Sequence, residues 1–250
     1  QPVGLSVRFQ TDAPKIYARW QPLWDPWLTE GETRLRQTGL DLYGQDQDGT
    51  WYFAGWGMPW QNAPWEAQLN TAPLDPGLRT YRLYLPHSMP LTALSIGVEP
   101  QTHIRILPPE PNRPIVIYGT SICHGSAVSR PGMAHTSILS RKLDWPVVNL
   151  GFAGNGRMDL PVVDRIARID ASVYVIDCLP NMSPEQVTQR IGPLIDRLRQ
   201  TRPRRPILFV GNRMFGDARF LQARRDTFTS KNMALESAFE TAVRNGATNI

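Results

Sequence analysis

Short apolar or alternating runs, separated by Pro, Gly, Asn and Asp, fill the first 109 residues. This pattern predicts short antiparallel strands of the kind that build a β-sandwich, and no stretch of this half forms a convincing amphipathic helix. The expected strands are Leu5–Phe9, Ile16–Trp20, Leu40–Tyr43, Trp51–Ala54, Arg79–Leu85 and Ala93–Val98.

After a proline-rich linker at 107–114 the pattern changes to apolar runs that alternate with helical stretches. Strands alternating with helices predict βαβ units, a parallel sheet and helices on both of its faces. The sequence therefore predicts a β-sandwich accessory domain at 1–109 and a three-layer α/β domain at 110–250. The expected strands are Ile115–Tyr118, Val147–Leu150, Val173–Ile176 and Ile207–Val210, and the helices lie near 133–143, 158–168, 184–200 and 223–245.

Composition narrows the possible partners. The net charge of +5 would allow an acidic partner, but the densest basic run, at 202–206, is broken by prolines and predicts a solvated loop. We expect no nucleic acid partner, and no membrane span, since no apolar run approaches roughly 20 residues. Cys123 and Cys178 suffice for neither a disulfide scaffold nor a metal site. They could pair, although two reduced buried thiols are the favoured interpretation, and we expect no metal and no cofactor.

Parallel sheets bind ligands at the carboxyl ends of their strands. Ser121 follows the first predicted strand, Gly154 the second and Asn181 the third. Singly, these positions also fit a plain strand–helix turn, a dinucleotide-binding loop of unusual glycine order, and an Asx-turn. Together they supply what acyl transfer needs, namely a nucleophile and hydrogen-bond donors aimed at an oxyanion. The predicted donors are the backbone N–H groups of Ser121 and Gly154 and the side-chain amide of Asn181.

These blocks resemble the SGNH hydrolases, also called the GDSL esterase superfamily. Gly119-Thr120-Ser121-Ile122 is similar to the nucleophile block in which threonine replaces aspartate, while Asp177 to Asn181 departs from the usual Gly-x-Asn-Asp block. The run 39–43 is similar to the G-x-D-L-Y motif of a β-domain that precedes some of these esterases, which implies a turn glycine at Gly39 and a loop-bracing carboxylate at Asp41. The resemblance implies a flavodoxin-like hydrolase domain that cleaves acyl esters, often acetyl groups on carbohydrates, without a cofactor.

The family's base is a late histidine with an aspartate three residues before it. None of the four histidines, His87, His103, His124 and His135, has that aspartate. We interpret His124 as a loop residue that lines the substrate pocket. The alternative that His124 is itself the catalytic base stays open. Because 245–246 predicts a helix end and 247–250 the start of another strand, we expect the Asp-x-x-His block beyond Ile250.

Seven of the eight tryptophans fall in the first 65 residues, and most are expected in the core. Trp56 and Trp60 lie in a Gly/Pro-rich stretch and are the better candidates for substrate contact. The leading hypothesis is a periplasmic or secreted serine esterase acting on a small-molecule or saccharide ester, most simply an acetyl ester. The alternatives are a non-catalytic carbohydrate-binding protein on a degenerate hydrolase scaffold, and a lipase or thioesterase.

Overall fold

The computed structural model describes residues 3–24, 30–59 and 63–250. Its contacts divide the chain into two compact units, the first built from Gln1–Pro111 and Gly125–Trp145 and the second from Asn112–His124 and Pro146–Ile250. The sequence predicts a boundary at 109–110. The contacts divide the chain just after it, at Pro111, and also assign 125–145 to the first unit.

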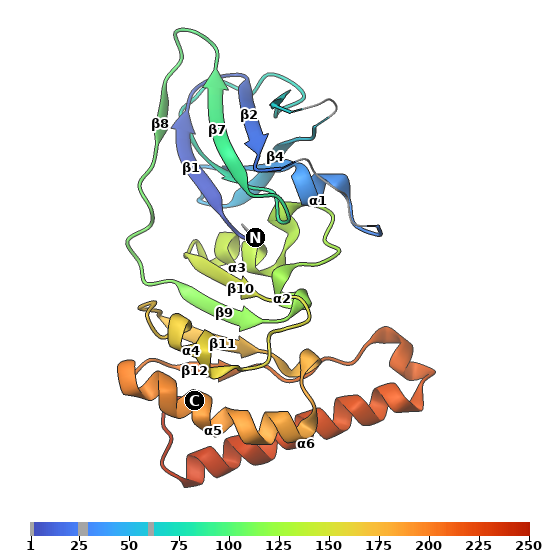
Figure 1. The fold of residues 1–250 in the computed structure, drawn as a ribbon. Helices are drawn as coiled ribbons and strands as arrows, with labels where there is room; N and C mark the ends of the chain where they lie inside the picture. Colours follow the sequence, from blue (N-terminus) through green and yellow to red (C-terminus); the bar gives the residue numbers. More distant parts are fainter. Residues whose placement is uncertain (1–2, 25–29, 60–62) are drawn as a thin grey trace. The chain divides into compact units, whose positions relative to one another are not determined.

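The first unit contains two antiparallel sheets (Figure 1). The larger has the order β4-β3-β6-β1-β8 and the smaller the order β5-β2-β7. The strands are β1 Ser6–Thr11, β2 Ile16–Pro22, β3 Leu40–Gln45, β4 Trp51–Gly57, β5 Trp65–Gln68, β6 Arg79–Tyr84, β7 Leu91–Val98 and β8 Ile104–Ile106. The first unit also contains three short helices: α1 Arg34–Thr38, the 3₁₀ helix η1 Pro131–Met133, and α3 His135–Leu143.

Inward-facing residues of both sheets form one core, which confirms the predicted sandwich. Trp20 and Trp65 of the smaller sheet meet edge to face with ring centroids 5.9 Å apart. The sequence pattern missed β5, β8 and α1. Helix α1 has no apolar face to detect, because its buried positions are Arg36, Gln37 and Thr38.

Asp41 of β3 braces a loop, as the sequence predicts. Its carboxylate is fully buried, accepts a hydrogen bond from the backbone N–H of Gly132 at 2.8 Å and pairs with Arg130 at 3.2 Å. A Cβ on Gly132 would lie 2.6 Å from the Asp41 carboxylate, so only glycine permits this approach. The prediction of a turn glycine at Gly39 is wrong. Gly39 has an ordinary φ of −92°, and it is required because a Cβ would lie 2.8 Å from the carbonyl oxygens of Leu35 and Gly57.

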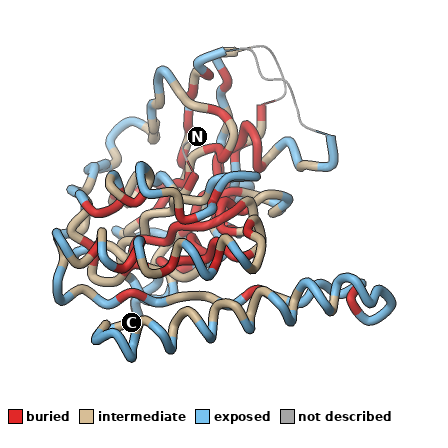
Figure 2. Tube along the Cα trace, turned by 60° about the horizontal axis from the view of Figure 1, so that its bottom comes forward, coloured by how far each residue is buried: buried red, intermediate tan, exposed pale blue. Residues whose placement is uncertain are grey.

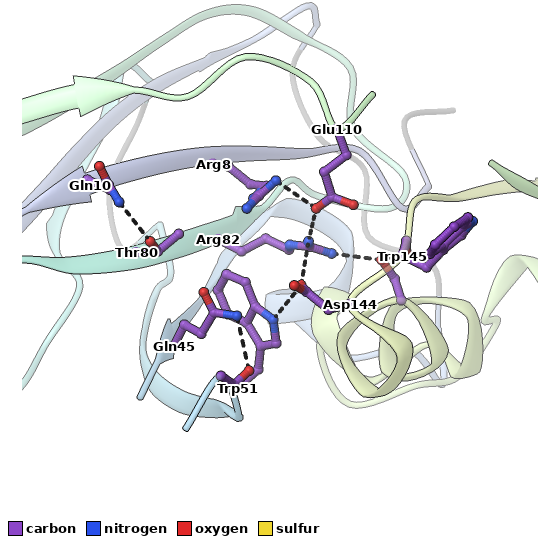
Figure 3. Close-up of polar contacts among 11 residues, drawn as sticks. Arg8, Gln10, Gln45, Trp51, Thr80, Arg82, Glu110, Asp144 and Trp145 are labelled. Carbon is purple, nitrogen blue, oxygen red and sulfur yellow. Dashed lines mark hydrogen bonds and ion pairs between the residues drawn. The ribbon is translucent and has the colours of Figure 1, made fainter. Parts of the chain in front are cut away.

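A second buried ionic cluster centres on Arg82 of β6 (Figure 3). Arg82 contacts Glu110 of the linker at 2.7 Å and donates to Ser140 of α3 at 2.7 Å. Arg8 also reaches Glu110, at 2.8 Å. Because removing one partner of a buried ion pair leaves an uncompensated charge, this cluster ties the linker and α3 firmly to the sheet.

The second unit contains a parallel sheet of order β10-β9-β11-β12 (Figure 1), as expected. Side chains of β9 and β11 that share one face form a single core with residues of α4 and α5. The strands are β9 Ile115–Gly119, β10 Val147–Gly151, β11 Val173–Asp177 and β12 Ile207–Phe209. The helices are α2 Ser121–His124, α4 Leu160–Ile166, η2 Leu179–Asn181, α5 Pro184–Thr201, η3 Gly216–Arg219 and α6 Gln222–Arg244.

Both long helices of the second unit have defined ends, and the helix end predicted at 245–246 is confirmed. Ser183 caps α5 through a capping box with Gln186, and Pro184 is its first residue. Helix α6 ends at Arg244 and is followed by Gly246 with φ +89°. It contains no fully buried residue, as its tan and pale-blue colouring in Figure 2 shows. Within the described ranges, no helix has the length and apolar character that crossing a bilayer requires.

Residues 247–250 do not form the predicted strand. The carbonyl oxygen of Asn249 does accept a hydrogen bond from the backbone N–H of Ile207, at 2.9 Å. This contact lies at the start of β12, and no ladder of paired residues follows it.

We predict that stability near Asp41 falls as pH rises. Burial, only partly offset by Arg130, raises the pKa of Asp41 from 3.8 to about 6, so the folded state holds this proton more tightly than the unfolded chain. The resulting stability is present below pH 3.8 and is lost as pH rises through about 6. Between pH 4 and 7.5, Asp41→Asn should gain on the order of 2 kcal/mol relative to the unsubstituted protein.

Urea unfolding followed by tryptophan fluorescence measures this change, because all eight tryptophans fall within the residue ranges of the first unit. Asp75→Asn, at an exposed aspartate, is the matched control and should show no such drift. A pH-independent difference between Asp41→Asn and the unsubstituted protein would contradict the prediction.

Candidate active site

Three strand ends of the second unit lie side by side at one level of the sheet. Gly119, the last residue of β9, pairs with Gly151 at the end of β10 and with Asp177 at the end of β11. The segments that carry Ser121, Gly154 and Asn181 therefore leave from adjacent strand ends. This is the edge at which the sequence predicts a site.

Ser121 is half-buried and is the first residue of the short helix α2. Thr120 before it is fully buried, and its hydroxyl oxygen accepts from the backbone N–H of Ile122 at 3.3 Å. The carbonyl of Thr120 accepts from the N–H of His124 at 2.9 Å. A threonine in the position that is more often aspartate thus closes the turn that presents Ser121.

The loop after β10 folds back onto β9. Phe152 donates its N–H to the carbonyl of Gly119 at 2.9 Å, and its own carbonyl accepts from Asn155 and Gly156 at 3.0 Å each. A Cβ on Gly156 would lie 2.0 Å from the carbonyl oxygen of Gly119. Gly154 occupies the exposed turn with φ +74°. The glycines therefore have two roles: Gly156 permits close packing and Gly154 permits the left-handed turn.

Asn181 ends the 3₁₀ helix η2 and donates its backbone N–H to the carbonyl of Cys178 at 3.2 Å. Its side-chain nitrogen Nδ2 is buried and donates to no acceptor among the described residues. A buried amide donor without a partner is costly, so it marks a position at which a ligand oxygen would be bound favourably.

Lys231 of α6 donates from Nζ to the carbonyl of Pro180, the residue before Asn181, at 3.0 Å. Burial lowers the pKa of Lys231. Nothing in the sequence pattern indicates this contact, because Lys231 follows Asn181 by 50 residues. It lies on the same face of α6 as Ala234 and Leu235, which pack against the core. Helix α6 therefore holds the loop that carries Asn181.

Both cysteines are free and fully buried, in agreement with the favoured interpretation. The thiol of Cys123 lies 3.8 Å from the carbonyl oxygen of Ile117, and burial, with a smaller effect of Asp177, raises its pKa to about 12. Burial likewise raises the pKa of Cys178. Neither thiol is a reactive nucleophile, and both are buried.

The remaining candidates lie elsewhere than expected. His124 is not a loop residue: it ends α2 with 4% exposure, and its backbone lies against Gly151. Trp56 belongs to β4 of the first unit, lies opposite Asp41 in the pairing of β3 with β4 and is 36% exposed, whereas Trp60 lies outside the described residues.

In the described ranges, no three His, Cys, Asp or Glu side chains gather in a group that could hold a metal ion.

The segments that carry Ser121, Gly154 and Asn181 thus leave from adjacent strand ends of one parallel sheet, the edge at which such sheets bind ligands. Residues 112–250 match the model of the GDSL-like lipase/acylhydrolase family, and residues 1–104 match GxDLY, the N-terminal domain of SGNH-hydrolase-type esterases. The chain therefore belongs to the GDSL-like lipase/acylhydrolase family.

Two solved structures share the fold. A GDSL-like lipase from Bacteroides ovatus ATCC 8483 is 36% identical, with a TM-score of 0.91 over 99% of this chain and 72% of its own. A salicylyl-acyltransferase from a tetracycline biosynthetic pathway is 19% identical, with a TM-score of 0.76 over 100% of this chain and 70% of its own. None of the curated proteins compared with the chain matches it.

We predict that Gly156→Ala disrupts this edge of the sheet. The new methyl group would meet the Gly119 backbone, which cannot move aside as a flexible side chain would. The free energy of unfolding should fall by about 1 to 3 kcal/mol, as measured by urea titration of the far-UV circular dichroism of the second unit's helices. Gly192→Ala is the matched control, because a Cβ there meets nothing within 4 Å and alanine favours the α5 helix. Equal stability of the two variants would contradict the prediction.

Proposed function

We propose that this chain hydrolyses small acyl esters through an acyl-enzyme on Ser121, with an acetyl ester of a saccharide as the substrate. The observation that carries the proposal is the common level of three strand ends, which brings the Ser121 turn, the Gly154 turn and the buried, unpartnered amide of Asn181 to one edge. The family match supports the broader activity of an acylhydrolase.

In the proposed mechanism the Ser121 hydroxyl oxygen attacks the ester carbonyl and its proton passes to a general base. The oxyanion that forms accepts hydrogen bonds from the N–H groups of Ser121 and Gly154 and from Nδ2 of Asn181. Each such donor contributes about 3 to 4 kcal/mol to transition-state stabilisation. The alcohol then leaves with a proton, and water releases the acid from Ser121.

The base implied by the family resemblance is a histidine in an Asp-x-x-His block, and none of the four histidines of this sequence stands in one. The oxyanion donors and substrate binding alone support a residual rate of ~10³–10⁴ over water. Added imidazole supplies a base from solution, so activity of this chain should increase with imidazole in a manner that requires Ser121.

The saccharide part of the proposal rests on the family resemblance and on the aromatic residues of the first unit. Trp56 is exposed on strand β4 and can stack on a sugar ring, and Trp60 is assigned the same role from its place in the sequence.

We predict that a fluorophosphonate probe labels the protein at Ser121. Labelling should fall at least tenfold in Ser121→Ala, because the probe forms its bond with the activated hydroxyl. Ser126→Ala is the matched control and should label as the unsubstituted protein does, since Ser126 lies outside the three strand-end segments. Undiminished labelling of Ser121→Ala would exclude Ser121 as the nucleophile. Absence of labelling in a folded protein supplied with imidazole would favour a carbohydrate-binding protein.

We also predict a preference for short acyl groups. With imidazole present, kcat/KM for 4-nitrophenyl acetate should exceed that for 4-nitrophenyl decanoate by about tenfold or more, equivalent to roughly 1.4 kcal/mol in the transition state. Rates of Ser121→Ala are subtracted to remove the background reaction of imidazole. A preference for the decanoate would instead support the lipase or thioesterase alternative.

A further inference from the structure

Asp177 is a buried carboxylate at the same edge of the sheet as Ser121. It ends β11, and its side chain is 5% exposed. Arg213, in the segment after β12, places Nη2 at 2.9 Å from Oδ1 and 2.7 Å from Oδ2. The arginine thus spans both oxygens of the carboxylate.

This pair differs from the other ion pairs of the second unit. In the described part of that unit, every other paired carboxylate has a side chain at least 41% exposed. Solvent screens those exposed charges, whereas a carboxylate at 5% exposure acts on its surroundings through a low dielectric. Replacing a buried ion pair by apolar residues often leaves the stability of a protein unchanged. Stability alone therefore does not explain why Asp177 and Arg213 form a buried pair.

The Asp177 side chain starts beside the residues that flank Ser121 in sequence. A Cβ on Gly119 would lie 3.3 Å from the Cβ of Asp177 and 2.7 Å from the Cβ of Cys123. Gly119 precedes Ser121 by two residues and Cys123 follows it by two. Burial is the main cause that raises the pKa of Cys123; the charge of Asp177 raises it further and that of Arg213 lowers it. The Asp177 carboxylate therefore starts next to the backbone that leads into helix α2.

Acylation of Ser121 develops a negative charge on the carbonyl oxygen of the substrate. An uncompensated carboxylate beside α2 would oppose that charge, and solvent would screen it little because the Asp177 side chain is only 5% exposed. Resting on the proposed function, we propose that Arg213 neutralises Asp177 and so removes an electrostatic barrier to oxyanion formation at Ser121. Arg213 acts through Asp177 and is a positioning residue of the site.

Four variants vary the charge at this position while changing the side-chain size as little as possible. Arg213→Gln leaves one net negative charge, Asp177→Asn leaves one net positive charge, and both the double variant and Arg213→Lys leave none. The rate of acylation should fall as the net charge of the pair becomes more negative. We expect Arg213→Gln to be about tenfold slower, the double variant and Arg213→Lys to be within about threefold of the unsubstituted protein, and Asp177→Asn to be equal or faster.

The measurements are the rate of fluorophosphonate labelling of Ser121 and the separate kcat and KM for 4-nitrophenyl acetate with imidazole present. Because this substrate is neutral, the loss in Arg213→Gln should appear in kcat, with KM changed less than threefold. Arg197→Gln, which breaks an exposed pair with Asp164 of 3.1 Å, is the matched control and should leave both constants unchanged. Circular dichroism establishes that each variant is folded.

Rates that follow net charge support the proposal, and any other order overturns it. If the pair acts only by holding the backbone, Asp177→Asn and the double variant will be as slow as Arg213→Gln. If Arg213→Gln does not fold, the comparison of Asp177→Asn with the double variant still decides, since a slow Asp177→Asn contradicts the proposal. Ser121-dependent labelling that is indifferent to all four variants would refute this inference and leave the proposed function standing.

Discussion

The close approach of three backbone segments around Gly119 is the constraint on which the candidate site depends. Parallel pairing sets Gly119 level with Gly151 and Asp177, but pairing alone would leave the following loops free to diverge. They stay together because a Cβ on Gly151 would lie 2.1 Å from the nitrogen of His124, and a Cβ on Gly156 would lie 2.0 Å from the oxygen of Gly119. Backbone packed against backbone is stiff, so the Ser121 turn is held rigidly.

In the first unit, buried charged side chains hold separate segments of the chain together. Asp41 fixes the backbone at Gly132, and Arg82 fixes Glu110 of the linker and Ser140 of α3 (Figure 3). These contacts explain why 125–145, which follows the helix of Ser121 in the chain, belongs to the first unit. The G-x-D-L-Y motif is thus a structural device: its aspartate organises a segment that lies 90 residues later in the chain.

Charge is arranged differently at the edge of the parallel sheet. Cys123, Cys178 and Tyr118 lie buried in the segments that form this edge, and burial raises the pKa of each of them, so they stay neutral. Asp177 is the buried acid here, and Arg213 pairs with it. A neutral surrounding with one unpartnered donor, Nδ2 of Asn181, is suited to a reaction that creates a single negative charge.

The sequence determined the two fold classes, most of the strands and the helix signals, because alternation, apolar runs and caps are local and report directly on burial. It also indicated Ser121, Gly154 and Asn181, because each follows a strand whose end could be placed. The short elements α1, β5 and β8 left too few residues for a pattern. Only the tertiary structure decided the grouping of 125–145 with the first unit and the contacts of Lys231 and Arg213, since these join residues far apart in sequence through single hydrogen bonds and ion pairs that leave no periodic trace.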